Sequence, residues 1–405
     1  MQPAVVVIAL AGLIGVGAAA ADEGGARFAV AVAIGAVGGL ALYQAAFGFT
    51  GAWRRWTRER RGAGLRAQIL LIAAAVCLSF PLITFGRDLG WPVGAWVFPF
   101  GLSSAIGAAM FGFGMQLGGG CGSGTLFTAG GGSSRMWLTL AAFVAGSVIW
   151  TGTNPEFQSG LSAGLAALGI EGRSFWSGTS LLREIGWSPA LMATLAALAL
   201  LAWWTMIAER RAHGELEAPR AGGHWLRGPW SREFAALALA GVVIACFLAL
   251  GRPWGVTAAF PLWGAKIADG IGLPIETWRA WDDGRLDRSI FADATGVMSF
   301  GVMLGALAAA GLAGRFAPSL TLAPRDAATA IVGGLLMGYG ARLAYGCNIG
   351  GLIGGVVSGS LHGWWWLLFG WIGSYAGVWA RIGLGMDPPF EDRSTYGGAQ
   401  IGGRP

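Results

Sequence analysis

The chain has 405 residues, of which 55% are hydrophobic and only 12% are charged, and its formal net charge is +6. Soluble domains carry roughly 25% charged residues, so this composition excludes an ordinary soluble protein and predicts an all-α polytopic membrane protein. The basic excess is nearly all arginine and lies in short segments between apolar stretches. That distribution is typical of a topology signal and not of nucleic-acid binding.

Ten apolar segments of about 17 to 24 residues follow one another along the chain, and each is long enough to cross a bilayer. The first lacks the basic leading region of a secretory signal peptide, so we expect it to be a span. The ten expected transmembrane helices cover residues 4–20, 28–47, 67–86, 94–117, 136–152, 189–207, 233–251, 290–313, 327–346 and 363–383.

Arginines mark three of the connections between these expected spans. They gather within residues 54–66, 210–232 and 315–325, after the second, sixth and eighth spans. All three connections join an even-numbered span to an odd-numbered one, so they share one side of the membrane. The positive-inside rule makes that side the cytoplasmic face of a cell inner membrane.

Two segments of twenty residues repeat within the chain. Gly107–Leu126 aligns without a gap with Gly333–Leu352, and eight of the twenty positions are identical, including a cysteine in each copy. Five expected spans separate the copies, so the two copies have opposite senses across the bilayer. A fainter pair, at 49–52 and 256–259, follows the second and seventh spans. The sequence thus predicts a five-plus-five inverted repeat, an architecture common in transporters.

This repeat divides the chain into four parts. Residues 1–207 form the first transmembrane repeat, which includes a periplasmic loop at 153–188, and residues 208–232 form a cytoplasmic linker. Residues 233–384 form the second, inverted repeat. Residues 385–405 are rich in proline, glycine and polar residues, and we expect them to be a disordered cytoplasmic tail.

Short apolar segments follow the two repeated cysteines, Cys121 and Cys347. They cover 122–129 and 348–358, which are too short to span the bilayer, and a full span follows each. We expect re-entrant half-helices, because irregular backbone at membrane depth needs protein or a wet cavity beside it. The free N–H groups and positive dipole ends of such helices favour an anion. The expected substrate path passes Gly120, Cys121, Gly122, Gly346, Cys347 and Asn348.

The cysteines suit a soft anion that must bind and then leave. A thiol is a weak donor and a weak acceptor, so it holds a sulfur-bearing anion without forming a deep trap. The alternative is that Cys121 and Cys347 are small buried packing residues, which is how we interpret Cys77 and Cys246.

Two polar residues of the repeat also lie on the expected path. Arg342 falls within a span, where a charge is costly and usually faces the interior. It either attracts the anion or pairs with an acid such as Asp293. Gln116 aligns with Arg342 in the first copy and could serve as a neutral ligand.

At these residues the chain resembles the YeeE/YedE family of membrane proteins, which includes thiosulfate uptake transporters. The matches run from Gly112-Phe113-Gly114 through Gly120-Cys121 to Gly124, and from Gly338-Tyr339-Gly340 through Gly346-Cys347 to Gly350. The resemblance covers roughly residues 28–384. It implies paired re-entrant helices, cysteines along an anion path, and a small cytoplasmic sulfur-carrier protein as a partner.

One position departs from the family pattern. Transporters of the family show a third cysteine in a Phe-Cys-x-x-Gly-x-x-Arg pattern, and Gly48 stands at that cysteine's position here. The stretches around Arg342, Cys347 and His362 look more like family members linked to selenium metabolism.

We therefore predict a permease for a small sulfur-containing anion, with thiosulfate as the first choice. The sequence suggests no catalytic residue, metal, cofactor or nucleic-acid partner, since no cysteine belongs to a C-x-x-C pair. A permease for a selenium compound or another sulfur oxyanion is the alternative. An alternative of another class is a membrane thiol redox protein that uses Cys121 and Cys347 as a dithiol.

Overall fold

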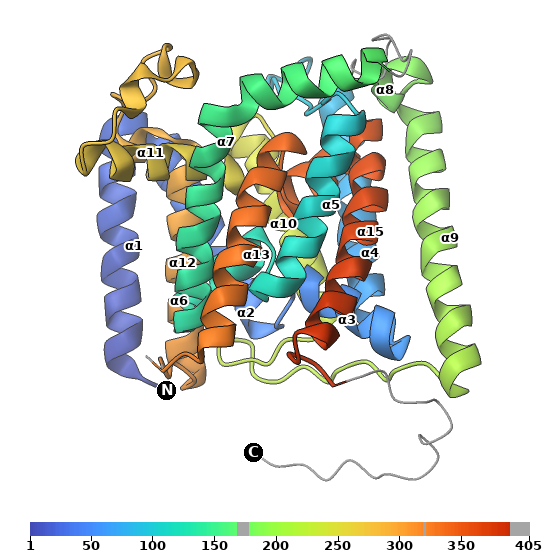
Figure 1. Cartoon of the computed structure of the whole chain (residues 1–405). Coiled ribbons are helices and arrows are strands. Elements are labelled where there is room, and N and C mark those ends of the chain that lie inside the picture. Colours follow the sequence, from blue (N-terminus) through green and yellow to red (C-terminus); the bar gives the residue numbers. More distant parts are fainter. Residues whose placement is uncertain (168–177, 319–320, 389–405) are drawn as a thin grey trace.

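Long helices that run roughly side by side make up most of the chain (Figure 1). The computed structural model describes residues 1–167, 178–318 and 321–388, and these ranges contain isolated bridges but no β-strand. The ten longest helices of the described residues are α1 (Pro3–Gly24), α2 (Ala26–Gln44), α4 (Ala63–Phe85), α5 (Leu102–Gly118), α7 (Ser134–Ala167), α9 (Trp187–His213), α10 (Arg232–Leu250), α12 (Ala294–Ala313), α13 (Pro324–Leu343) and α15 (Leu361–Gly383).

Eight helical segments of the described residues are long and apolar enough to cross a membrane. The chain is therefore an all-α, multi-pass membrane protein. A long helix lies in each of the ten expected ranges, but α5 and α15 are not among the eight segments. α5 is short, with 17 residues, and both helices are rich in glycine.

Short helices lie between the long ones. They are α3 (Phe49–Glu59), α6 (Gly122–Gly130), α8 (Leu181–Glu184), η1 (Thr257–Ala259), α11 (Phe260–Gly270), η2 (Ile275–Thr277), η3 (Arg279–Trp281), η4 (Ile290–Ala292), η5 (Asn348–Ile353) and α14 (Gly354–Val357). α6 and the η5–α14 unit begin directly after the two repeated cysteines, so the expected short helix is present after each. α3 and α11 were not predicted as helices.

Helices from the two halves of the sequence interleave. α2 packs against α12 and α10 against α4, while α5 packs against α15 and α13 against α7. Glycines permit these close contacts. A methyl group built on Gly112 of α5 would lie 2.0 Å from Gly370 O of α15, and one built on Gly338 of α13 would lie 2.3 Å from Phe143 O of α7. Such small residues let membrane helices approach backbone to backbone.

The short elements cover the two ends of the helix layer (Figure 1). α8, α11 and the last part of α7 lie at the end drawn at the top, which we call the upper face. α3, the N-terminus and the linker 214–231 lie at the opposite end, the lower face. α1 and α9 stand at the two lateral edges of the layer.

Two helix boundaries differ from the expected ones. The helix expected at 94–117 begins only at Leu102, because Pro92 and Pro99 lack the N–H group that a helix interior needs. The helix expected to end at 152 continues as α7 to Ala167, so the first part of the expected loop 153–188 is helical. Pro155 removes one backbone hydrogen bond but does not end this helix. Residues 168–177 of that loop lie outside the described residues.

The first residues of the expected tail are held against the lower face. Arg325 Nη1 donates a hydrogen bond to Gly385 O at 2.7 Å, and Arg381 Nε pairs with Asp387 Oδ2 at 2.7 Å. Two helix-borne arginines thus bind polar groups of residues 385 and 387. Residues 389–405 lie outside the described part of the chain.

Candidate functional site

The two short helices that follow the repeated cysteines contact each other. α6 begins at Gly122 and η5 at Asn348, so Cys121 and Cys347 occupy their N-cap positions. A methyl group built on Gly122 would lie 2.9 Å from Cys347 Sγ, so this thiol packs directly on the first residue of α6. The structure thus joins the two predicted motifs in one place, which we call the thiol site (Cys121, Gly122, Cys347 and Asn348).

Cys121 is bound into the start of α6. Its Sγ accepts a hydrogen bond from Gly124 N at 3.4 Å and lies 3.6 Å from Ser123 Oγ. This contact is a sulfur counterpart of helix capping, in which a side-chain acceptor satisfies a free N–H group of the first turn. The backbone of Phe49, the first residue of α3, also interacts with this sulfur. Cys121 is thus bound to the first turn of its own helix and is almost fully buried.

Cys347 occupies the equivalent position but makes no capping hydrogen bond. The chain turns sharply before it, with φ of +57° at Tyr345 and +151° at Gly346. Trp366 Nε1 holds this turn by donating to Gly346 O at 3.1 Å. The six residues that follow form a π-helix, a rare geometry that occurs frequently at functional sites. The Cys347 thiol is fully buried and packs against Gly122 of α6.

Several polar atoms around the thiol site are buried without a hydrogen-bond partner among the described residues. They are both amide atoms of Asn348, Oε1 of Gln116, and Oγ1 of Thr125 and Thr50. Gln116 Nε2 does donate, to Thr50 O at 3.2 Å and to Ser374 Oγ at 2.8 Å. Buried polar groups are nearly always bonded, so unpartnered ones indicate where a ligand or water completes the set. Asn348 gives the clearest indication, because neither of its polar atoms is bonded.

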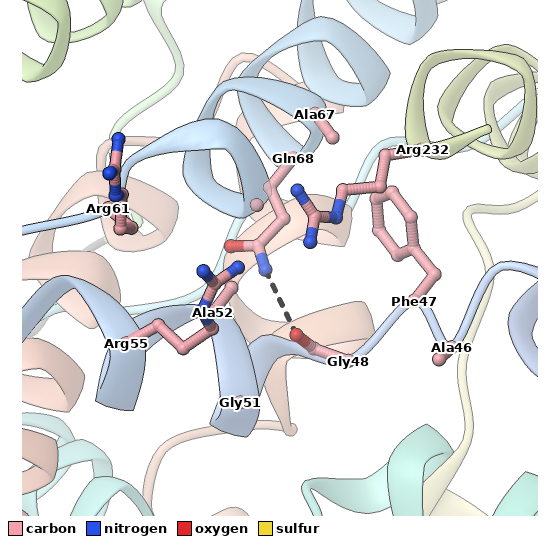
Figure 2. A pocket seen from close by; sticks show the side chains of 11 residues that line it. Ala46, Phe47, Gly48, Gly51, Ala52, Arg55, Arg61, Ala67, Gln68 and Arg232 are labelled. Atoms are coloured by element: carbon pink, nitrogen blue, oxygen red, sulfur yellow. Dashed lines mark hydrogen bonds between the residues drawn. The ribbon is translucent and has the colours of Figure 1, made fainter. Parts of the chain in front are cut away.

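A cavity of about 170 Å³ opens beside Gly48 at the lower face (Figure 2). Arg55, Gln68 and Arg232 extend toward it, and Gln68 Nε2 donates to Gly48 O at 3.4 Å. A methyl group built on Gly48 meets nothing within 4 Å, so a larger side chain fits there. Glu217 Oε1 pairs with Arg55 at 3.0 Å and with Arg232 at 3.1 Å. Burial raises the pKa of Glu217, but hydrogen bonds from these two arginines outweigh it and lower the pKa overall.

Arg342 lies at the upper end of α13, outside the thiol site. The structure shows neither an ion pair with Asp293 nor one with any other carboxylate of the described residues. Its guanidinium instead sits over the ring of Trp150, 5.0 Å from the ring centroid, and its buried Nε has no hydrogen-bond partner. Arg342 and Asp293 line the same upper cavity, so the predicted pair is close by but not formed.

Sequence reasoning did not single out the residues of α3 and η1 that reach the thiol site. The backbone of Phe49 reaches Cys121, and Thr257 Cγ2 lies 3.3 Å from a methyl group built on Gly122. These two segments carry the fainter of the two sequence repeats, and that repeat could have indicated that they belong to the site. Gly120, which was predicted, packs on the first turn of α6.

Comparison with known proteins bears on the same residues. A family model described as sulphur transport matches residues 44–376. The chain is 32% identical over 155 residues to "Probable transporter YedE" of Escherichia coli (strain K12), a match that covers 38% of this chain and 38% of that protein.

Two longer matches are to thiosulfate transporters. "Thiosulfate transporter TsuA" of Spirochaeta thermophila is 27% identical over 287 residues, which cover 69% of this chain and 77% of that protein. The protein of the same name in Escherichia coli (strain K12) is 25% identical over 353 residues, which cover 85% of this chain and 92% of that protein. The resemblance to the YeeE/YedE family is thereby confirmed.

Proposed function

The chain belongs to the sulphur transport family, and on that premise we propose that it takes up a small sulfur-containing anion, with thiosulfate as the first choice. The observation that carries this proposal is the contact of Cys347 Sγ with Gly122, beside Cys121. Two thiols at the starts of two short helices therefore share one buried site. A family of transporters, and not of enzymes, supplies the context for that site.

The helix contacts support an inverted repeat with ten spans. A two-fold exchange of the halves maps α2–α12 onto α10–α4 and α5–α15 onto α13–α7, and all four pairs are in contact. Gly112 and Gly338 occupy equivalent positions of the sequence repeat and make equivalent backbone approaches. We therefore include α5 and α15 as spans, so that each repeat has five: α1, α2, α4, α5 and α7 in the first, and α9, α10, α12, α13 and α15 in the second.

The orientation follows from the arginines of the lower face. That face carries the arginine-rich connections, so the positive-inside rule places it in the cytoplasm and the upper face in the periplasm. Residues 208–232 are then a cytoplasmic linker, and the protein resides in the inner membrane. The anion enters from the upper face, meets Cys347 and Cys121, and leaves through the cavity at Gly48.

The chemistry of the thiol site suits brief binding of a soft anion. Neutral thiols and the Asn348 amide offer weak donors, and no lysine or arginine lies among the four residues of the site. Conduction requires binding weak enough to allow release. Re-entrant entry of the two short helices from opposite faces would give the anion a short constriction between two wider cavities.

Uptake of labelled thiosulfate by proteoliposomes tests this path. We expect Cys347→Ala and Cys121→Ala to reduce the initial rate by at least about tenfold, which corresponds to about 1.4 kcal/mol. Cys77→Ala is the matched control, because Cys77 is a free, exposed cysteine on α4. Size-exclusion chromatography checks that each variant is folded. Undiminished uptake by both motif variants would contradict the cysteine path.

The same assay determines which anion is the preferred substrate. Thiosulfate, sulfite, selenite and sulfate can be compared in parallel, because Gly48 replaces the third cysteine of the family pattern. A rate highest for selenite would favour the selenium alternative. A small cytoplasmic sulfur-carrier protein would accept the anion at the lower face, beside the Gly48 cavity.

A dithiol redox protein is the second candidate, and the nearness of Cys347 to the Cys121 motif favours it. All four cysteines are free in the structure. Counting free thiols before and after uptake separates the two functions. A transporter keeps both thiols reduced during turnover, whereas a redox protein shows a stoichiometric loss of two.

A further inference from the structure

A cavity of about 770 Å³ opens at the upper face, between the end of α7, α11 and the segment 279–295. Five arginines line it: Arg252, Arg279, Arg285, Arg288 and Arg342. Arg279, Arg285 and Arg288 lie within one ten-residue segment, and the fold brings Arg252 and Arg342 to them from distant parts of the chain. The volume exceeds that of a small anion many times, since one water occupies about 30 Å³, and it leaves room for hydration.

Few of these arginines are neutralised. Two carboxylates line the cavity, Glu156 and Asp293. Asp293 is engaged as the cap of α12, where Oδ1 accepts from Thr295 N at 3.2 Å and Oδ2 from Gly296 N at 3.0 Å. Arg285 pairs with Asp283. Within the described residues the other four arginines have no ion pair, so the lining, with five arginines and two carboxylates, carries an excess of positive charge.

Arg342 is the innermost of these cations and the one with the least compensation. It stands in the last turn of α13, a buried helix, with its guanidinium over Trp150 and its Nε unpartnered. A charge held at membrane depth without a partner is costly and usually faces a functional cavity. A guanidinium fork matches the oxygens of an oxyanion, and its flat face is free to stack on an aromatic ring.

The floor of this cavity adjoins the thiol site. Ala258 lines the cavity, and its neighbour Thr257 packs against Gly122, on which the Cys347 thiol also packs. An anion held by the arginines is therefore one residue layer from the thiols. The opposite cavity, beside Gly48, differs because the carboxylate of Glu217 pairs with two of its arginines.

We propose that this arginine-lined cavity is a separate binding site for divalent oxyanions, with Arg342 as its central ligand, placed before the thiols on the uptake path. Its role in uptake rests on the proposed function, whereas binding itself does not. Selection is then divided between two places. The arginines select the charge and oxygens of the anion, and the thiols select a soft sulfur, so sulfate occupies the cavity without being transported.

Binding of inorganic sulfate to the purified full-length protein in nanodiscs tests this site without any transport. Titration calorimetry at constant ionic strength, with chloride as the balancing anion, gives the dissociation constant. We expect saturable binding of sulfate to wild type, weakened at least about tenfold in Arg342→Gln, which loses one charge-assisted hydrogen-bonding group. Arg342→Lys keeps the charge but not the fork, and we expect an intermediate constant. Arg220→Gln, an exposed arginine of the lower-face linker, is the matched control.

Two variants make the test decisive. Cys347→Ala leaves the arginines intact, so we expect its sulfate affinity to equal that of wild type while its thiosulfate uptake falls. Arg342→Gln changes a buried residue and could fail to fold, so Arg288→Gln removes a second arginine of the same cavity at an exposed position. It should also weaken sulfate binding. Absence of saturable sulfate binding, or equal affinity in both arginine variants and wild type, overturns the site. Sulfate binding without thiosulfate uptake would instead support the binding site and refute the proposed transport function.

Discussion

The helix that starts after Cys121 and the helix that starts after Cys347 share one motif but hold their thiols differently. Cys121 accepts a hydrogen bond from the first turn of α6, whereas Cys347 makes no such bond and precedes a π-helix. The first arrangement uses the thiol to build a helix start. In the second, the Asn348 side chain beside the buried thiol has no hydrogen-bond partner among the described residues. The difference suggests that the repeated motif has one mainly structural copy and one mainly binding copy.

The largest effect should come from the glycine before each cysteine. Gly346 has φ of +151°, and a methyl group on it would lie 2.5 Å from Gly351 N. Gly120 has no such φ, and a methyl group on it would lie 3.0 Å from Thr125 N. Backbone strain of this kind costs about 1–3 kcal/mol, and the backbone clash adds to it.

We therefore expect Gly346→Ala to lower the melting temperature of the purified protein clearly more than Gly120→Ala. Nano-format fluorescence melting in the same detergent measures both variants side by side. Equal losses in the two variants would show that the turns before the cysteines are equivalent, and the contrast between the copies would disappear.

The second prediction compares Asn348 with Gln116, because one is expected to act in binding and the other in stability. Asn348 makes no side-chain hydrogen bond, whereas Gln116 donates to Thr50 O and to Ser374 Oγ. Gln116→Ala should cost about 1–3 kcal/mol of stability, because two bonds are lost and two acceptors stay buried. Asn348→Ala should leave the melting temperature unchanged or higher, since it removes unsatisfied polar atoms, yet raise the KM for thiosulfate. A large stability loss in Asn348→Ala would mean that its amide is bonded in the membrane.

The sequence predicts the features that depend on neighbouring residues and misses those that depend on residues far apart along the chain. A short helix after each cysteine was predictable, because a Gly-Cys-x-x-Gly motif followed by a short apolar run is a local pattern. The π-helix after Cys347 was not, since the same local motif precedes an α-helix in the other copy. α3 escaped notice because its arginines interrupt the apolar run that marks a span.

The thiol site and the upper cavity needed the fold itself. Cys347 meets Gly122 only because helices from the two halves interleave, which no local pattern states. The arginines of the upper cavity likewise come from segments that are far apart along the chain, so their common cavity appears only in three dimensions. Sequence reasoning found Arg342 as an unusual charge and left open whether it attracts the anion or pairs with Asp293, whose carboxylate is used as a helix cap.

The smallest predicted effect concerns the lower end of the first copy. Arg381 Nη1 donates to Gln116 O at 2.8 Å, and the same guanidinium pairs with Asp387 through two bonds of 2.7 Å and 2.8 Å. Hydrogen bonding and attraction from Arg381 lower the pKa of the Asp387 carboxyl. A carboxyl with a lowered folded-state pKa stabilises the fold above its unfolded pKa of about 3.9, and this stabilisation is lost as the pH falls through the folded value.

Asp387→Asn should therefore reduce stability at pH 7 by about 1 kcal/mol, because asparagine keeps one acceptor for Arg381 but removes the charge from this mostly buried pair. The difference from wild type should shrink as the pH falls below about 4, where the wild-type carboxyl also becomes neutral. Melting curves of both proteins between pH 3 and 7 measure it, with the exposed Asp22→Asn as control. A difference that grew with acid would show that Asp387 does not anchor this end of α15, and the first copy would then lack the ion-pair support that distinguishes it from the second.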